Sequence, residues 1–350
     1  MICLNKGDKV RIGILFGGKS FEHDISIVSA NVVYHGLKDK YEVYLLYIDK
    51  EGNFLNPKKL DILEMANDKK YKKFSFVKGG IKTNKLQRID VIISTMHGLN
   101  GEDGLASIIA NLYDIPYVGS NHISSGLLLD KHFTYAILRN LKIKTINTKF
   151  YIDNKIDDNL KLPLIIKPAR LGSSIGISKI SDINEFSDKA VKAFKFDNKI
   201  IVQPFIENFR EYNQAAYLYK GEVIVSNVEE VFKSEDILSF DDKYLSTKIK
   251  KNHAFITDCE LVEKITEITK KIYTSFELSG IVRIDYMVVG DEVLVNEINT
   301  TPGSLAYYLF DDDILALLEK QIHTALLNYQ NKKDTSFKSS VLYQKYNYKK

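Results

Sequence analysis

The sequence predicts an α/β protein whose C-terminal half has a mixed α+β organisation. Short apolar strands alternate with helix-like periodicity in the N-terminal half, which is the pattern of a parallel sheet with helical crossovers. The segment from Glu211 to Leu309 is instead rich in strands. With 350 residues, of which 45% are hydrophobic and 27% charged, the chain is long enough for two or three globular domains.

The N-terminal part is predicted to form a doubly wound parallel sheet. Its first strand is followed by Gly17 and Gly18, and a helix begins near His23. Such sheets bind ligands beyond the carboxyl ends of their strands, where Glu22 and His97 both lie, so these two are candidate site residues. The expected strands are Val10–Phe16, Tyr41–Asp49, Asp90–Thr95 and Ile115–Gly119.

The middle of the chain combines one helix with two strands that end in polar residues. The helix is expected over Ser124–Leu138 and carries Asp130 and Lys131. The strands are expected over Leu164–Lys167 and Ile200–Gln203.

Lys167 and the turn after it are candidates for binding phosphate. The sheet would fix the ammonium of Lys167 as a point charge, and the turn 170–177 adds glycines and the hydroxyls of Ser173 and Ser174. The alternatives are a lysine whose charge simply reaches solvent and an ordinary glycine-serine turn.

A β-hairpin near the C-terminus carries the most specific pattern in the chain. Two β-branched strands, Ile281–Val289 and Glu292–Asn299, flank a Gly-Asp turn signal. Side chains two positions apart share a face, so Arg283 accompanies Asp285, and Glu297 accompanies Asn299.

These polar pairs converge only if the hairpin loop has the right parity. A loop with an odd number of residues, such as 290–292, would place Asp285 opposite Glu297, whereas a two-residue loop would place them on opposite faces. Two carboxylates and the amide oxygen of Asn299 would then make an oxygen site suited to Mg²⁺, so an odd loop is predicted. The alternative is a surface hairpin with solvated charges.

Two further segments are less specific. In HGLNGEDG, 97–104, acidic residues precede a helix, and capping alone could explain them, although it does not explain His97. The polar loop Lys233–Asn252 carries Lys243 and Tyr244 and is long enough to be functional, although such a pair is usually found on a surface.

Composition excludes several classes of function. No apolar run reaches the length of a membrane span, and the N-terminus is expected to enter a first strand rather than form a signal peptide. A net charge of +4, without a clustered basic face, argues against nucleic-acid binding. The two cysteines, Cys3 and Cys259, favour a reducing, cytoplasmic compartment.

Taken together, these segments resemble the D-alanine–D-alanine ligases of the ATP-grasp superfamily. The resemblance covers about residues 11–318 and rests on nine motifs in family order. They are GGKSFEHDISIVSA, HGLNGEDG, PYVGS, LLLDK, LIIKPARLGSSIG, VQPFIENFREYN, DDKYLS, RIDY and NEINTTPGS.

The resemblance implies three domains, ATP as cofactor and two Mg²⁺ ions, for which Mn²⁺ could substitute. The implied segments are an N-terminal Rossmann-like domain 1–120, a central ATP-grasp part 121–203, a C-terminal part 204–330 with the lid 233–252, and a basic tail 331–350. It also implies D-alanine as substrate, no nucleic-acid or membrane partner, and a homodimer.

Residue roles are implied by the same resemblance. ATP would be bound by Lys131, Lys167, Ser173, Ser174, Gln203, Pro204, Phe205, Ile206, Glu211 and Lys243. Metal would be bound by Asp285, Glu297 and Asn299. Substrate would be bound by Glu22, His97, Tyr244, Arg283, Gly303, Ser304, Tyr308 and Leu309. Among these, the catalytic set would be Glu22, Ser173, Lys243, Tyr244, Arg283 and Gly303.

The implied reaction has two steps. A D-alanine carboxylate attacks the γ-phosphate of ATP to give an acyl phosphate and ADP, and the amine of a second D-alanine then displaces phosphate. Because both steps build negative charge on oxygens, catalysis would rest on positioning and electrostatics, with Arg283 and the Gly303 N–H stabilising the tetrahedral oxyanion.

The chain departs from the family pattern at two positions. Gln203 stands where a glutamate usually contacts adenine, and its amide oxygen can still accept from the adenine amino group. Tyr308 stands where many members place a serine for the second substrate's carboxylate, which Tyr308 or Ser304 could then bind. Tyr244, where D-lactate users tend to have phenylalanine, favours an amine acceptor.

Two other functions are open alternatives. One is an ATP-grasp carboxylate–amine ligase with another D-amino or D-hydroxy acid as acceptor, which Tyr308 motivates. The other is a catalytically inactive nucleotide-binding regulator, against which the intact set of charged residues argues.

Overall fold

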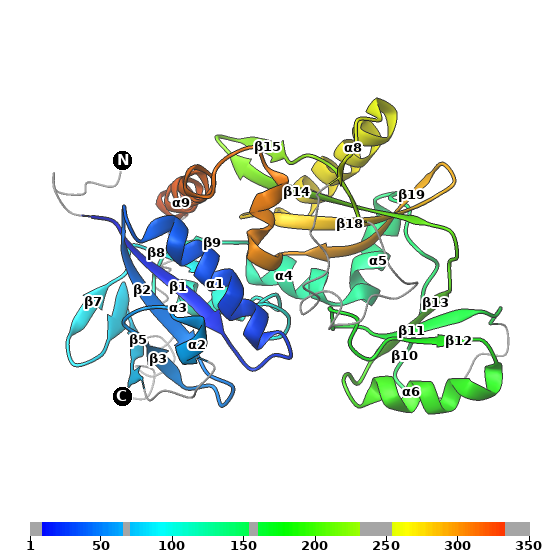
Figure 1. The fold of residues 1–350 in the computed structure, drawn as a ribbon, viewed down its shortest axis with the longest axis horizontal. Coiled ribbons are helices and arrows are strands. Elements are labelled where there is room, and N and C mark those ends of the chain that lie inside the picture. The colour runs from blue at the N-terminus through cyan, green and yellow to red at the C-terminus, as the bar shows by residue number, and fades with distance from the viewer. Residues whose placement is uncertain (1–8, 66–70, 154–159, 232–253, 333–350) are drawn as a thin grey trace, which may run out of the picture.

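The computed structural model describes residues 9–65, 71–153, 160–231 and 254–332. It contains three groups of elements (Figure 1). An N-terminal sheet with its helices lies on one side, a small sheet with helix α6 lies at the far end, and the C-terminal sheet with helix α8 lies between and above them. Within the described residues no helix combines the length and the apolar character needed to cross a membrane.

The N-terminal sheet has the parallel core that the sequence predicts. Its strand order is β4-β3-β2-β1-β8-β9, with β1 parallel to both β2 and β8, and β8 parallel to β9. The elements are β1 (Arg11–Gly17), α1 (His23–Leu37), β2 (Glu42–Ile48), β3 (Phe54–Asn56), α2 (Ile62–Met65), β4 (Lys72–Lys73), β8 (Val91–Ser94), α3 (Leu105–Leu112) and β9 (Tyr117–Val118).

A small antiparallel sheet, which the sequence pattern does not predict, is inserted before β8. It contains β5 (Ser75–Val77), β6 (Gly80–Lys82) and β7 (Leu86–Arg88). Phe76 from β5 packs edge-on against Phe54 and Phe74. Strands of three residues are too short to give a period-two signal in the sequence.

The single helix predicted over Ser124–Leu138 is wrong, because two helices stand there. Helix α4 (His122–Leu129) and helix α5 (Lys131–Asn140) meet at Asp130, whose φ and ψ of −85° and 103° are extended. Asp130 caps α5 by accepting a hydrogen bond from His132 N, and it pairs with Lys199 at 2.7 Å. The break places Lys131 at the first position of α5.

The central sheet is antiparallel, with strand order β10-β13-β11-β12. Its outer face is covered by helix α6, which buries Phe186, Ala190 and Ala193 against the sheet. The elements are β10 (Lys149–Tyr151), β11 (Leu164–Pro168), β12 (Ser178–Ile180), the 3-10 helix η1 (Ile183–Glu185), α6 (Phe186–Phe194) and β13 (Ile200–Pro204).

The C-terminal sheet has strand order β17-β16-β14-β18-β19, with β15 paired to β14. Helix α8 packs over one face and leaves the other face to the site. The elements are β14 (Arg210–Tyr219), β15 (Glu222–Val225), β16 (Glu229–Val231), β17 (Ala254–Phe255), α8 (Cys259–Ser275), β18 (Val282–Val289), β19 (Glu292–Asn299), the 3-10 helix η2 (Gly303–Leu309) and α9 (Ile314–Gln330).

The β18–β19 hairpin confirms the predicted pairing but not the predicted loop. Val289 pairs with Glu292, so the loop has two residues and the prediction of an odd loop is wrong. A β-bulge at Asn296 supplies the extra residue instead, because the register shifts there and Asp285 pairs with Glu297. The extra residue that brings Asp285 opposite Glu297 therefore lies inside β19 and not in the loop.

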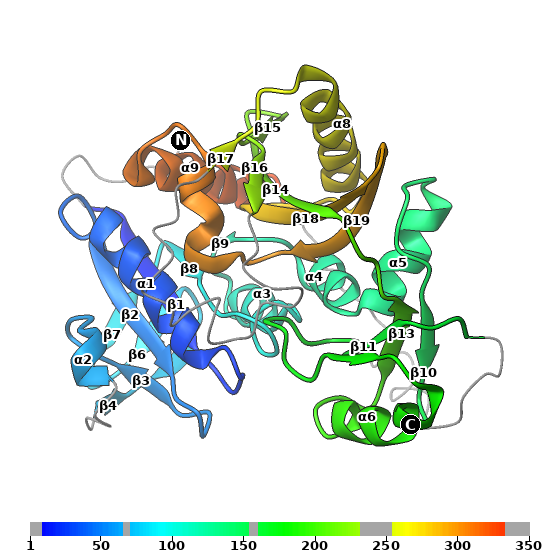
Figure 2. The ribbon, with the colours of Figure 1, turned by 45° about the vertical axis from the view of Figure 1, so that its right-hand side comes forward.

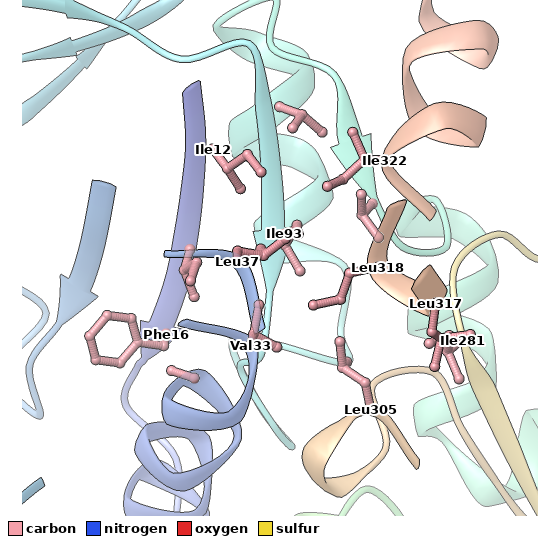
Figure 3. Packing of buried hydrophobic residues seen from close by; sticks show 14 of the residues in the cluster. Ile12, Phe16, Val33, Leu37, Ile93, Ile281, Leu305, Leu317, Leu318 and Ile322 are labelled. Atoms are coloured by element: carbon pink, nitrogen blue, oxygen red, sulfur yellow. The ribbon is translucent and has the colours of Figure 1, made fainter. Parts of the chain in front are cut away.

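The largest hydrophobic core crosses the predicted boundary at residue 120. Ile12 and Phe16 from β1, Leu37 from α1 and Leu318 from α9 belong to one cluster (Figure 3). Leu305 from η2 belongs to it as well. The opposite face of β1 is covered by α3, so the parallel sheet is buried on both sides. The domain boundaries remain a prediction.

Candidate active site

A cleft of about 940 Å³, including its open mouth, lies between the central and C-terminal sheets. It collects ten of the predicted site residues from segments far apart in the sequence. These are Lys131, Lys167, Ser173, Ser174, Gln203, Pro204, Phe205, Ile206, Glu211 and Glu297.

Strand β11 presents Lys167 to the cleft by simple alternation. Leu164 and Ile166 are buried against α6, whereas Ile165 and Lys167 are partly exposed and line the cleft. Ile165 pairs with Gln203 on β13, and both line the same wall. An apolar side chain therefore lies beside a fixed ammonium, which is an arrangement that could hold a flat base and a phosphate chain.

Gln203 has one polar atom with no partner. Its side chain is only 1% exposed, and its Nε2 donates to Thr148 Oγ1 at 2.9 Å. Its Oε1 is buried and finds no hydrogen-bond partner among the described residues. A buried acceptor without a donor is costly, so a hydrogen-bond donor that reached this oxygen would lower the free energy.

Strand β18 gathers the predicted charged residues on one face. Arg283 donates to both oxygens of Asp285, at 2.7 and 2.9 Å, and Asn299 Nδ2 donates to Asp285 Oδ2 at 3.1 Å. Burial raises the pKa of the Asp285 carboxyl, and the Arg283 guanidinium opposes that effect. Met287 continues the same face and lines the cleft.

Lys131 balances the second carboxylate of the predicted metal site. Its ammonium lies 2.8 Å from Glu297 Oε1 and donates to the carbonyl of Leu171 at 2.7 Å. Within the described residues no cluster of three or more His, Cys, Asp or Glu side chains could hold a metal ion. The predicted ligands include only two such side chains, Asp285 and Glu297. The third is the amide oxygen of Asn299, and together they form an oxygen donor set.

Glu22 and Ser173 meet across the cleft. The Ser173 hydroxyl donates to Glu22 Oε1, and Ser173 has a φ of 53° within the turn that follows β11. A β-carbon built at Gly172 would lie 3.8 Å from an oxygen of Glu22 and equally far from one of Glu297. This glycine therefore lies between the predicted substrate residue and the predicted metal residue.

The close approach of Glu22 requires glycine at position 98. A β-carbon on Gly98 would lie 2.6 Å from Glu22 Oε2 and 2.9 Å from Ser20 Oγ, and the φ of Gly98 is 62°. The glycine of HGLNGEDG is therefore explained by the space that Glu22 occupies.

His97 contacts protein groups rather than open space. Its side chain is 4% exposed, its Nδ1 lies 2.7 Å from the carbonyl of Thr301, and its Nε2 lies 2.8 Å from Ser29 Oγ. Burial lowers the pKa of His97 to about 4, so the ring is neutral near pH 7. Both ring nitrogens are engaged by protein groups, and the predicted contact of His97 with substrate stays a prediction.

The segment after β19 carries the remaining predicted residues, of which Tyr308 interacts with Arg283. A β-carbon at Gly303 would meet nothing within 4 Å, so this backbone borders open space. Burial raises the pKa of the Tyr308 hydroxyl, and the Arg283 guanidinium acts in the opposite direction. Leu309 is fully buried in the first core, so its side chain has a packing role. Ser304 N donates to Ser29 Oγ.

Sequence reasoning missed several residues of this site. Asn213 pairs with Asp285 across β14 and β18 and, with its amide oriented to donate, reaches Asp285 Oδ1 at 3.1 Å. Its position two residues after Glu211 on one strand was the available signal. Glu102 lies in the HGLNGEDG segment, whose acidic residues capping could explain, and its bond to Thr301 N spans 199 residues. Ser29 carried no signal, because its partners His97 and Ser304 lie 68 and 275 residues away in the sequence. Lys243 and Tyr244 lie outside the described residues.

Comparison with known proteins agrees with this geometry. The family model of the D-ala D-ala ligase N-terminus matches residues 11–120, and that of the C-terminus matches residues 132–314. A D-alanine–D-alanine ligase from Thermosipho melanesiensis is 36% identical and covers 95% of this chain and 98% of its own. One from Campylobacter concisus is 36% identical and covers 87% and 89%.

Solved structures show the same arrangement. A D-alanine–D-alanine ligase from Helicobacter pylori superposes with a TM-score of 0.75 at 31% identity, over 93% of this chain and 99% of that one. The VanG D-Ala:D-Ser ligase from Enterococcus faecalis superposes with a TM-score of 0.77 at 25% identity, over 91% and 100%.

The two facing sheets, the cleft between them and these likenesses define an ATP-grasp enzyme fold. Within that class, the chain belongs to the D-alanine–D-alanine ligase family.

Proposed function

We propose that this protein joins two D-alanine molecules into D-alanyl-D-alanine at the expense of ATP, for peptidoglycan synthesis. The observation that carries the proposal is the cleft itself, where lysines from α5 and β11 face the carboxylates of the β18–β19 hairpin beside Arg283. Membership of the family supports the same reaction.

ATP would bind along the wall of the cleft that β11 and β13 form. The unpartnered Oε1 of Gln203 would accept a hydrogen bond from the adenine amino group, and residues 204–206 would line the base. Glu211 would hold the ribose. Lys131 and Lys167, with the hydroxyls of the turn, would hold the phosphates.

The reacting end lies beside Glu22. Its carboxylate, held by Ser173, would pair with the ammonium of the first D-alanine, whose carboxylate attacks the γ-phosphorus and releases ADP. The second amine then attacks the acyl carbon, loses a proton, and phosphate leaves. Arg283 and the Gly303 N–H would stabilise the oxyanion formed in that step.

The donor set on the hairpin fits divalent magnesium, or manganese in its place. Asp285 and Glu297 face each other and their charge is balanced by Arg283 and Lys131, so added cations would exchange with ammonium and guanidinium partners. Two such ions, when bound, would neutralise phosphate oxygens. Asn299 would add an amide oxygen.

The second substrate would bind near Tyr308 and Ser304. Tyr308 beside Arg283, or Ser304, would hold the second carboxylate, and the predicted lid residues Lys243 and Tyr244 would close over the reaction. Family resemblance favours a homodimer, and the need for ATP favours a cytoplasmic location.

The test is to incubate the purified protein with ATP, Mg²⁺ and D-alanine, measure ADP, and identify the product by mass. We expect D-alanyl-D-alanine, and we expect Arg283→Ala to lower the rate on the order of 10²–10³. Arg139→Ala is the matched control, because Arg139 is exposed on α5, does not line the cleft, and donates from Nε to the Tyr135 carbonyl of its own helix.

Two outcomes would contradict the proposal. If D-alanine alone gave no ADP while D-serine or D-lactate as second substrate did, the ligase reading would stand but the acceptor would be wrong. If no acceptor supported ADP formation, the chain would be a nucleotide-binding protein without this activity.

A further inference from the structure

The segment that follows Gly303 has an unusual backbone. Ser304, Leu305 and Ala306 have φ values of 50°, 53° and 48°, so three consecutive non-glycine residues are left-handed. L-residues adopt this conformation at a cost in free energy, because the Cβ approaches the following carbonyl. Such strain persists only where surrounding contacts overdetermine it.

Three hydrogen bonds, from helix α1 and from the loop after β8, hold this segment. Thr301 N donates to Glu102 Oε1 at 3.1 Å, and the Thr301 carbonyl accepts from His97 Nδ1 at 2.7 Å. Ser304 N donates to Ser29 Oγ at 2.8 Å. Both backbone polar groups of Thr301 and the first left-handed N–H are therefore bound by side chains from another part of the chain.

The proton positions in this network follow from its acceptors. A carbonyl only accepts, so His97 must carry its proton on Nδ1 to reach Thr301. Ser29 Oγ accepts from Ser304 N, and its own proton is then directed to His97 Nε2 at 2.8 Å. One tautomer of a neutral imidazole satisfies every partner, in agreement with the pKa of about 4 that burial gives His97.

The two anchored residues, Thr301 and Ser304, lie on either side of Gly303, the proposed oxyanion donor. Gly303 lies between Thr301 and Ser304, and its backbone borders open space. Leu305 and Ala306 are buried in the core shared with α1 and α9. A small change at either anchor would therefore move the Gly303 backbone while the buried part stayed in place.

We propose that Ser29, His97 and Glu102 are positioning residues that hold the 301–306 segment in its left-handed form, so that the Gly303 N–H faces the reaction. This assignment rests on the proposed function. It gives His97 an indirect role, through the loop, in place of the predicted contact with substrate. The device acts on the second step, in which the acceptor amine attacks, and leaves phosphoryl transfer unaffected.

The test compares Ser29→Ala, His97→Asn and the double variant with wild type. Asparagine can still donate to Thr301 but offers nothing at the Nε2 position, so both single variants break the same Ser29–His97 link. We expect each single variant to lower kcat for dipeptide formation about tenfold to hundredfold. This is the loss expected when a buried polar group is left without its hydrogen-bond partner. The KM for ATP should stay within about twofold of wild type.

Two readouts separate positioning from general damage. Oxygen exchange within ¹⁸O-labelled ATP, measured with D-alanine present, reports the first step and should be retained. The double variant should lose no more than about threefold beyond the worse single variant, because both changes break one network. Ser124→Ala is the matched control: its buried hydroxyl bonds to the Phe276 carbonyl, far from this segment, and its kcat should not change.

Several results would overturn the assignment. Dipeptide formation by Ser29→Ala near the wild-type rate would do so, as would loss of isotope exchange in parallel with dipeptide formation. If Ser29→Ala failed to fold, His97→Asn would carry the same test alone. Wild-type protein that formed no dipeptide would remove the proposed function and this assignment together, whereas an active wild type with active variants would remove only the assignment.

Discussion

In the loop after β8, burial shifts the pKa values of His97 and Glu102 so that each favours its uncharged form. His97 would be half protonated near pH 6.5 in an unfolded chain, but enclosure between Ser29 and Thr301 keeps it neutral. Burial and the nearby Glu22 carboxylate raise the pKa of Glu102 to about 8 in the same loop. The two shifts act on stability with opposite signs.

The depressed pKa of His97 predicts a pH dependence of stability. Its folded pKa of about 4 lies below the unfolded value of 6.5, so below pH 6.5 the unfolded state binds a proton that the folded state does not. The contribution is therefore present above pH 6.5 and is lost as the pH falls toward 4, by about 3 kcal/mol in total.

Urea unfolding of wild type and His97→Asn at a series of pH values between 7.5 and 4.5 measures this effect. The free energy of unfolding should fall more steeply with acid for wild type, since the variant lacks this titration. Groups such as Glu102 titrate in both proteins, so they cancel in the comparison. Parallel curves would show that His97 is not held neutral.

At the scale of elements, irregularities in the secondary structure place the charged groups of the site. The bulge at Asn296 sets Asp285 opposite Glu297, and the break at Asp130 sets Lys131 at the start of α5, where it reaches Glu297. Without either irregularity, a regular hairpin or one continuous helix would point these groups elsewhere.

The break between α4 and α5 predicts a specific loss of stability. Asp130 is buried, pairs with Lys199 and caps α5, so Asp130→Ala should lower the free energy of unfolding by about 3–5 kcal/mol. Asp130→Asn keeps a capping oxygen and should lose about 1 kcal/mol less.

Denaturant unfolding of both variants provides the measurement. Combining Asp130→Asn with Lys199→Met should recover part of the loss, because no buried charge is then left unpaired. Equal losses for the alanine and asparagine variants would contradict the capping role of Asp130.

At the scale of the whole molecule, helix α9 joins the two ends of the chain into one core. Leu317, Leu318 and Ile322 from α9 pack with Ile12 and other residues of the N-terminal sheet (Figure 3). The 301–309 segment lies in the same core, between α1 and β18. The N-terminal sheet therefore depends on the C-terminal helix for burial of one face.

This shared core predicts that one mutation in α9 weakens the whole molecule. Leu318→Ala should lower the free energy of unfolding by about 2–5 kcal/mol, because Leu318 is fully buried. Leu327→Ala on the exposed side of the same helix is the control and should change it by less than about 0.5 kcal/mol.

Calorimetry and urea unfolding should show one transition in wild type and in both variants. A separate early transition in Leu318→Ala, with the remaining melting unchanged, would mean that the N-terminal sheet is stable by itself.

The sequence by itself determined the alternation of strands and helices, the face shared by Arg283 and Asp285, and the placement of Lys167 at a strand end. These follow from local periodicity, which a chain carries wherever it folds. The nine motifs in order added the family. The small sheet β5–β7 was not predicted, because its three-residue strands are too short to show a periodic pattern in the sequence.

Only the tertiary structure decided where the odd residue of the hairpin lies, that the helix breaks at Asp130, and what His97 contacts. Each depends on partners distant in sequence: Tyr135 bonds the bulge carbonyl of Asn296, Lys199 pairs with Asp130, and Thr301 meets His97. Such contacts leave no periodic trace in the sequence, because their energy is gained only when separate segments pack together.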